Sequence, residues 1–248
     1  MDWDGVSYDR VSAPQARWGK AVLERLHLTG DETVLDAGCG TGRVTEELAA
    51  ALPHGHVVAL DASASMLDQA RARLAHSAAN VSFVQADLLD LRPDLLDGSA
   101  PLDAVLSTAT FHWVTNHDQL FVNLRSVLRR GGQLVAQCGG AGNLGNVIAA
   151  VRSLGVERVG TWLYATPEET VPRLERAGFG DLEVWCHPEV ASFPDGAGLV
   201  EFLVTVCLRE HLATMAPGER SPFAAAVAAA LPAPAIDYVR LNIVARAK

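Results

Sequence analysis

The segment from Val34 to Gly42 (Val-Leu-Asp-Ala-Gly-Cys-Gly-Thr-Gly) most strongly constrains what this chain can fold into. Its first residues are typical of a short buried strand, three glycines follow at alternate positions, and helical spacing begins at Arg43. Glycine accepts positive φ and has no Cβ, so the backbone of such a turn can approach a ligand closely. The order strand, glycine-rich turn, helix therefore predicts an α/β unit with a ligand at the turn, unless the turn is only a tight connection.

Short apolar strands and helices alternate from residue 20 to about residue 190. We expect strands over 33–37, 56–60, 81–85, 102–107 and 133–137. Helices are expected over 21–28, 43–52, from a cap at Ser63 or Ser65 to 76, and over 118–130. Repeated βαβ units predict a parallel sheet with helices on both faces, which is a doubly wound α/β fold.

The pattern changes after residue 139. Helices are expected near 147–154 and over 167–177, the second capped by Thr166 and ended by Gly178. Strands are expected over 181–187 and 237–245. Between them lie an apolar helical stretch over 199–213 and an alanine-rich helix over 222–231, so the segment 193–235 is predicted to be a helical insertion.

Composition excludes several classes of protein. The 248 residues are 49% hydrophobic, which argues against a disordered chain. The net charge is −9, and no basic cluster suggests nucleic-acid binding. Apolar runs are shorter than the ~20 residues that span a bilayer, and the N-terminus lacks signal-peptide features. Four scattered cysteines without zinc-ligand spacing predict reduced thiols in a cytoplasmic protein that binds no metal.

Three aspartates are expected at the carboxyl ends of the first three strands, where α/β sheets bind ligands. Asp36 beside the glycines favours a cationic group over a phosphate. Asp61 is placed to accept the hydroxyls of a ribose, and Asp87 to accept a hydrogen bond from an adenine amino group. Asp61 and Asp87 can alternatively be helix caps or members of surface turns.

These residues resemble the class I S-adenosylmethionine-dependent methyltransferases. Asp36 to Gly42 match the first motif, Asp61 the ribose-binding acid and Asp87 the adenine-side acid. The resemblance implies a Rossmann-like, seven-stranded, mostly parallel sheet whose last strand is antiparallel, with S-adenosyl-L-methionine as cofactor. The implied cofactor-binding residues are Asp36, Gly38, Cys39, Gly40, Thr41, Gly42, Asp61, Ala62, Met66, Ala86, Asp87, Leu88, Ser107, Tyr8 and Gln15. Met66 can equally be a buried helix residue.

Further segments are similar to trans-aconitate methyltransferase-like proteins. They include Tyr8–Arg10 and Ser12–Trp18, which look like an N-terminal lid, and Phe111–Val114 followed by Asp118. The expected organisation is one domain over 1–248, with a lid or helix over 1–30, a cofactor-binding core over 31–138 and a helical cap over 193–235. Residues 139–192 and 236–248 complete the sheet and the substrate side.

Candidate substrate residues are Tyr8, Phe111, His112, Trp113, Trp162, Tyr164 and Arg209. The aromatic residues can form an apolar wall, and Arg209 can bind a carboxylate through its guanidinium group. The competing interpretation is that they are core aromatics and an exposed helix charge. His112 is the one candidate general base, because an imidazole titrates near neutrality. It can instead be a packing residue, since a carboxylate acceptor is already ionised and needs no base.

The leading hypothesis is an enzyme that transfers a methyl group to a small molecule, with a carboxylate oxygen as the first choice of acceptor. A nicotinamide-dependent oxidoreductase also has a glycine-rich turn, but Arg43 replaces its usual third glycine and Asp87 would have no role. A cyclase or a non-enzymatic scaffold on the same fold is a third possibility. The sequence leaves monomer and homodimer open.

Overall fold

The computed structural model describes residues 9, 13–77, 79–157, 160–194 and 196–248, and only the backbone of residues 13–17. Its strands are β1 (Thr33–Ala37), β2 (His56–Asp61), β3 (Val81–Gln85), β4 (Leu102–Thr108), β5 (Leu128–Gly139), β6 (Phe179–Ser192) and β7 (Ala235–Ala247). Its α-helices are α2 (Ala13–Leu23), α3 (Arg43–Ala51), α4 (Ala64–Leu74), α5 (His117–Val127), α6 (Gly145–Ser153), α7 (Pro167–Ala177), α8 (Gly196–Phe202), α9 (Arg209–Ala213) and α10 (Pro217–Ala230). Short 3-10 turns are η1 (Pro93–Leu96) and η2 (Phe111–Trp113), and η3 (Leu203–Cys207) is a π-helical turn.

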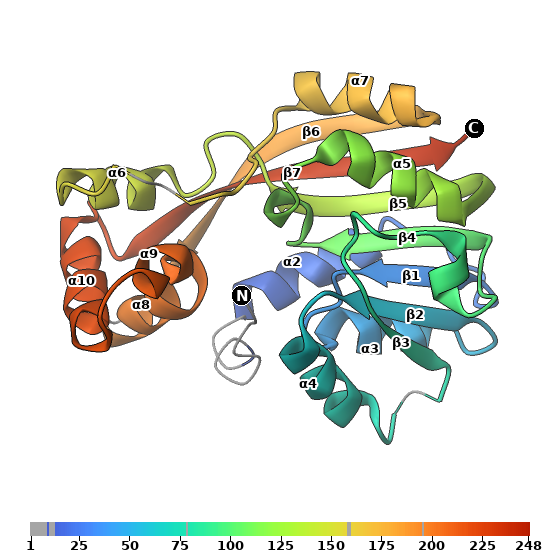
Figure 1. The fold of residues 1–248 in the computed structure, drawn as a ribbon, viewed down its shortest axis with the longest axis horizontal. Coiled ribbons are helices and arrows are strands. Elements are labelled where there is room, and N and C mark those ends of the chain that lie inside the picture. Colours follow the sequence, from blue (N-terminus) through green and yellow to red (C-terminus); the bar gives the residue numbers. More distant parts are fainter. Residues whose placement is uncertain (1–8, 10–12, 78, 158–159, 195) are drawn as a thin grey trace.

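The strands form one seven-stranded sheet in the order β3-β2-β1-β4-β5-β7-β6 (Figure 1). Within the group β1 to β5, every pair of neighbouring strands is parallel. Strand β7 is antiparallel to both of its neighbours, β5 and β6. This confirms the predicted Rossmann-like sheet, mostly parallel with an antiparallel last strand. The carboxyl ends of β1 to β5 consequently meet at one edge, beside the N-terminal half of β7.

Helices cover both faces of the sheet (Figure 1). Helices α5 and α7 bury apolar residues such as Phe121 and Leu174 against one face. On the other face, Val22 of α2, Leu26 just after that helix and Leu48 of α3 pack over the central strands. Both faces of the inner strands are therefore removed from water, which is why these strands are almost uninterrupted runs of aliphatic residues.

A group of helices lies beyond the edge to which the parallel strands point (Figure 1). It consists of α6, α8, η3, α9 and α10, and the last four connect β6 to β7. Their buried residues, including Val147, Phe202 and Val227, form one cluster with Ile236 and Tyr238 of β7. The long pair β6–β7 thus joins this helical group to the sheet.

Several predicted element boundaries were wrong. The expected helix over 21–28 is α2, which begins at Ala13 and ends at Leu23. The helix expected over 118–130 ends at Val127, because Leu128 adopts an extended conformation and pairs with Leu102 as the first residue of β5. The helix expected over 199–213 is interrupted by the π-helical turn η3.

The alanine-rich helix also differs from its expected bounds of 222–231. It begins at Pro217 and continues through Pro222, which the sequence had suggested as its start. Proline fits the first turn of a helix well, so two candidate prolines in one segment made the true start ambiguous.

In the described part of the chain, no helix combines the length and apolar character needed to cross a membrane.

Helix α7 was predicted accurately because its ends have strong local signals. Thr166 caps the helix by accepting a hydrogen bond from the backbone N–H of Glu169, whose own side chain accepts one from the backbone of Thr166. Gly178 ends the helix in the left-handed conformation, with φ of 93°. This reciprocal cap satisfies two donors that a helix start otherwise leaves unpaired.

We predict that Thr166→Ala lowers the free energy of unfolding by about 1 kcal/mol, because the N–H of Glu169 loses its acceptor. Urea denaturation followed by circular dichroism measures the change. Thr166→Ser retains the hydroxyl group and serves as the matched control. Equal destabilisation by the two substitutions would contradict a capping role for this side chain.

Candidate functional site

The glycine turn after β1 adopts the backbone conformation that its sequence predicts. Gly38, Gly40 and Gly42 all have positive φ, at 84°, 54° and 81°. A Cβ on Gly38 would lie 2.2 Å from Thr110 Oγ1, whereas one on Gly40 would meet nothing within 4 Å. Gly38 is therefore required for packing, and Gly40 borders open space from which a ligand can approach the backbone.

Hydrogen bonds hold this turn against β2. The N–H groups of Gly38 and Cys39 both donate to the carbonyl oxygen of Leu60, at 2.8 and 3.0 Å. The N–H of Gly40 donates to Asp61 Oδ2 at 2.9 Å, and the N–H of Ser63 donates to Asp61 Oδ1 at 2.9 Å. The carboxylate of Asp61 thus fixes the turn and the start of α4 together at the end of β2.

The other two aspartates have contrasting environments. Asp87 follows β3, is exposed, and accepts a hydrogen bond from the N–H of Leu89. Asp36 is buried near the end of β1, where its Oδ2 accepts a hydrogen bond from Thr45 Oγ1 at 2.7 Å. Its Oδ1 has no hydrogen-bond partner among the described residues. Burial, with a smaller contribution from the charge of Asp61, raises the pKa of Asp36 to about 7.

A cavity of about 690 Å³ lies along the carboxyl edge of the sheet. At one end it is bounded by the glycine turn and by residues that follow β2 and β3. At the other end it is bounded by η2, η3 and β7 and by Asn143, Leu144, Trp162 and Tyr164. Twelve of the predicted site residues line it: Gly38, Gly40, Asp61, Ala62, Met66, Ala86, Asp87, Leu88, His112, Trp113, Trp162 and Tyr164.

Other predicted residues do not line this cavity: Asp36, Cys39, Thr41, Gly42, Ser107, Phe111 and Arg209. Two have clear structural contacts instead. Ser107 donates from Oγ to the carbonyl oxygen of Ala37, and Phe111 packs edge-on against Phe121 in the core. Tyr8 lies outside the described residues, as does the side chain of Gln15, so the structure does not place either group.

Aromatic side chains line the end of the cavity away from the glycine turn. The rings of Trp162 and Tyr164 stack at 5.7 Å with an interplanar angle of 17°, and Trp113 meets Trp162 edge-on at 5.9 Å. Glu210 of α9 accepts hydrogen bonds from the N–H and the hydroxyl of Thr161, one residue before Trp162. Helix α9 therefore helps to position this aromatic wall.

His112 belongs to the same wall, but its environment is unfavourable for proton transfer near neutrality. Its Nδ1 accepts a hydrogen bond from the N–H of Gly139 at 3.3 Å, which leaves the proton of the neutral ring on Nε2. Burial, then the charges of Arg240 and His117, lower the pKa of His112 to about 3. The neutral side chain is thus a hydrogen-bond donor rather than an efficient base.

Sequence reasoning missed several cavity residues, of which Arg240 has the most distinctive chemistry. Arg240 is buried on β7 and lines the cavity. Its Nε donates to Gln137 Oε1 at 3.2 Å, and its guanidinium lies over the ring of Trp18 at 4.6 Å. An arginine inside an alternating apolar strand is a sequence signal for a functional side chain. The sequence does not place Arg240 in the cavity, however, because that placement depends on the pairing of β7 with β5.

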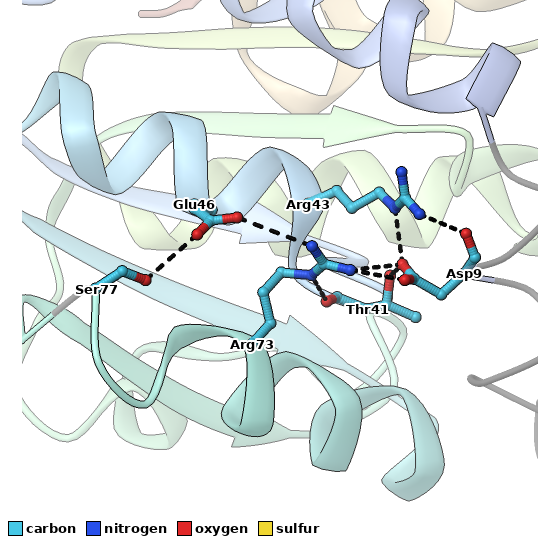
Figure 2. Close-up of polar contacts among 6 residues, drawn as sticks. All are labelled: Asp9, Thr41, Arg43, Glu46, Arg73 and Ser77. Atoms are coloured by element: carbon cyan, nitrogen blue, oxygen red, sulfur yellow. Dashed lines mark hydrogen bonds and ion pairs between the residues drawn. The ribbon is translucent and has the colours of Figure 1, made fainter.

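A polar cluster joins Asp9, near the N-terminus, to the end of the glycine turn (Figure 2). Asp9 Oδ1 accepts hydrogen bonds from Thr41 Oγ1 at 2.8 Å and from Arg43 Nε at 2.7 Å. Arg73 of α4 donates to both carboxylate oxygens of Asp9 and, through Nε, to the carbonyl oxygen of Thr41. Asp9 therefore connects the turn, α3 and α4.

Comparison with known proteins identifies the fold. A family model described as a methyltransferase domain matches residues 34–132. The structure of phosphoethanolamine N-methyltransferase 2 from Haemonchus contortus, in complex with phosphomonomethylethanolamine and S-adenosylhomocysteine, aligns with a TM-score of 0.65 at 18% identity. That alignment covers 98% of this chain and 57% of the other, and it shows a shared fold.

Two relatives are trans-aconitate 2-methyltransferases. The one from Acidovorax ebreus (strain TPSY) is 35% identical over 136 residues, which are 55% of this chain and 49% of that protein. The match thus spans about half the length of that relative. The one from Azoarcus sp. (strain BH72) is 30% identical over 241 residues, covering 93% of this chain and 90% of the relative. The chain therefore belongs to the S-adenosylmethionine-dependent methyltransferase family.

The raised pKa of Asp36 predicts a specific pH dependence of stability. The folded protein retains a proton that the unfolded chain releases between about pH 4 and pH 7, so the free energy of unfolding falls as the pH rises through this window. Between pH 5 and pH 8 we expect Asp36 to contribute a decrease of ~2 kcal/mol. Urea denaturation of ligand-free wild type and Asp36→Asn at both pH values measures it. The same pH dependence in both proteins would contradict this assignment.

We also predict that Asp9→Asn weakens S-adenosylhomocysteine binding roughly three- to tenfold, because a neutral amide cannot hold Arg43, Arg73 and Thr41 together. The free energy of unfolding should change by less than about 1 kcal/mol, since the cluster is partly exposed. Isothermal titration calorimetry measures the affinity. Asp68→Asn, which removes the exposed ion pair with Arg71, is the matched control. Unchanged affinity in both variants would show that Asp9 does not position the turn.

Proposed function

We propose that this protein transfers the methyl group of S-adenosyl-L-methionine to a carboxylate oxygen of a small molecule. The observation that supports this most is the composition of the cavity along the carboxyl edge. Glycines and carboxylates bound one end, and an aromatic wall without an efficient base bounds the other. A carboxylate acceptor is ionised near neutrality, so methyl transfer to it requires no proton removal.

The residues at the first end fit the cofactor. Gly40 borders open space, and we propose that Asp61 binds the ribose hydroxyls while Asp87 lies on the adenine side. Met66 lines the cavity from α4, where its thioether can pack on a flat base. Asp36 is buried near the end of β1, behind the residues that line the cavity, and its unpartnered Oδ1 suits the ammonium group of the methionine moiety. Tyr8 and Gln15 remain proposed contacts by resemblance.

Bound S-adenosyl-L-methionine supplies an electrophilic methyl group, because its sulfur carries a positive charge. The protein's contribution is to hold donor and acceptor together in line and to exclude water. Trp113, Trp162 and Tyr164 form the apolar side of the acceptor pocket. The neutral His112 can donate a hydrogen bond from Nε2 to an oxygen of the acceptor, so we propose a positioning role for it rather than that of a base.

We propose a single domain over 1–248, with 193–235 as a helical cap, and a cytoplasmic protein whose partner is a small molecule rather than nucleic acid or a membrane. Whether the active form is a monomer or a homodimer is best measured by light scattering. Among the described residues, no three His, Cys, Asp or Glu side chains are grouped as a metal site requires.

We predict that Asp61→Ala weakens binding of S-adenosylhomocysteine at least tenfold, because the turn loses the acceptor for Gly40 N–H and the ribose loses its proposed partner. Isothermal titration calorimetry provides the measurement. Asp90→Ala removes an exposed carboxylate close to β3 and should leave the affinity unchanged. An affinity unaffected by Asp61→Ala would overturn the proposed cofactor site.

The activity is tested with S-adenosylmethionine that has a labelled methyl group and a panel of carboxylic, phenolic and amine acceptors. We expect label in a carboxylate ester, at a rate that does not depend on ionisation of His112 between pH 6 and pH 8. Protein that binds S-adenosylhomocysteine but labels none of these acceptors would instead favour a non-methylating role, as a cyclase or a scaffold.

A further inference from the structure

Strand pairing places a cation in the acceptor half of the cavity. The last residue of β5, Gly139, is paired with Arg240 of the antiparallel strand β7. Arg240 therefore lies at the carboxyl edge of the sheet although it is only the sixth residue of its strand. It is 3% exposed, and the rings of Trp18 and Tyr238 lie 4.6 and 5.9 Å from its guanidinium carbon. These contacts hold a planar donor group beside the aromatic wall.

The charges around the cavity are unequally distributed. Among the described residues that line it, Arg240 is the only arginine and there is no lysine. The acidic side chains in the same set, Asp61 and Asp87, follow β2 and β3 at the other end of the cavity. A guanidinium group binds one carboxylate through two parallel hydrogen bonds. The described wall thus has one matching site for a carboxylate and would leave further carboxylates without a cationic partner.

The remaining surface at this end is flat and apolar. Trp162 stacks on Tyr164, and His112 lies 5.8 Å from Tyr164 with an interplanar angle of 34°. Val206 of η3 and Leu144 add aliphatic groups to the lining. Stacked rings favour a planar ligand, whereas a second or third carboxylate against them would lose hydration without compensation.

We infer that the acceptor is a planar monocarboxylate with an apolar body, that Arg240 binds its carboxylate, and that Trp162 and Tyr164 contact the body. This inference rests on the proposed methyl transfer and specifies the acceptor class. It differs from the tricarboxylate for which the curated relatives are named.

The reaction is balanced without a base. One carboxylate oxygen remains hydrogen-bonded to Arg240 while the other forms a bond to the methyl carbon as the carbon–sulfur bond breaks. The negative charge of the acceptor and the positive charge of the sulfonium are both lost, and the products are a neutral methyl ester and a neutral thioether. No proton is released, which agrees with the environment of His112.

The first experiment compares two acids that share a trans-propenoate unit. trans-Cinnamate has one carboxylate and a phenyl ring, and trans-aconitate has three carboxylates. We expect kcat/KM for trans-cinnamate to be at least tenfold higher in a labelled-methyl assay, and 2-naphthoate to be methylated as well. In the S-adenosylhomocysteine complex, calorimetry should show that trans-cinnamate binds and that uncharged trans-cinnamamide binds at least tenfold more weakly.

The second experiment tests the two parts of the pocket separately. Arg240→Gln should lower kcat/KM for trans-cinnamate about 100-fold, mainly through KM, because the carboxylate loses its cationic partner. Arg240→Lys keeps the positive charge but lacks the planar guanidinium group. Its kcat/KM for trans-cinnamate should lie between those of the wild type and Arg240→Gln. Trp162→Leu should lower kcat/KM for trans-cinnamate about tenfold and leave trans-aconitate unchanged. Arg246→Gln, on the same strand but outside the cavity, is the matched control.

The outcomes separate this inference from the proposed function. If trans-aconitate is the better acceptor, or if Arg240→Gln and Arg246→Gln have equal effects in proteins that bind S-adenosylhomocysteine normally, the inference is wrong while methyl transfer stands. If neither monocarboxylate is methylated nor binds the S-adenosylhomocysteine complex, the acceptor class is also wrong. Failure of the wild type to bind S-adenosylhomocysteine would overturn the proposed function itself.

Discussion

The whole site depends on the turn that links the end of β1 to the end of β2. Two backbone N–H groups share the carbonyl oxygen of Leu60, and a third donates to Asp61. These bonds form only because the alternating glycines accept left-handed backbone angles without a Cβ. The same contacts that connect two parallel strands therefore also keep the backbone open toward the cavity.

Buried ionisable groups distinguish the two ends of that cavity. Near β1, burial raises the pKa of Asp36, so its charge is unfavourable unless a cation is nearby. Near β7, a buried guanidinium is surrounded by aromatic rings, and its field helps to keep His112 neutral. A donor with cationic groups and the anionic acceptor that we propose would thus match opposite ends of one continuous space.

Local patterns in the sequence were sufficient to predict the order of the strands and the glycines and aspartates that follow β1, β2 and β3. The glycine turn, the aspartates after β2 and β3, and the capped helix α7 each have short-range signals within a few residues. His112, Trp113, Trp162 and Tyr164 at the other end of the cavity were also predicted. Arg240 could not be found in that way, because it reaches this end only through antiparallel pairing with β5, a contact between segments about a hundred residues apart. Helix boundaries failed where tertiary pairing took precedence, as at Leu128, which joins β5 instead of extending α5.

The long pair β6–β7 joins two parts of the molecule: the sheet with its cofactor turn, and the helices that lie beyond the carboxyl edge of the sheet. The generic methyltransferase model ends at residue 132, before Tyr164, Arg240 and the helices that support the aromatic wall. Those helices are inserted between two strands on one side of the sheet, so their sequence and length can change without altering the turn after β1. Changes in that insertion, together with changes at the loop and β7 positions that line the cavity, can therefore reshape the proposed acceptor end without disturbing the turn that presents the donor.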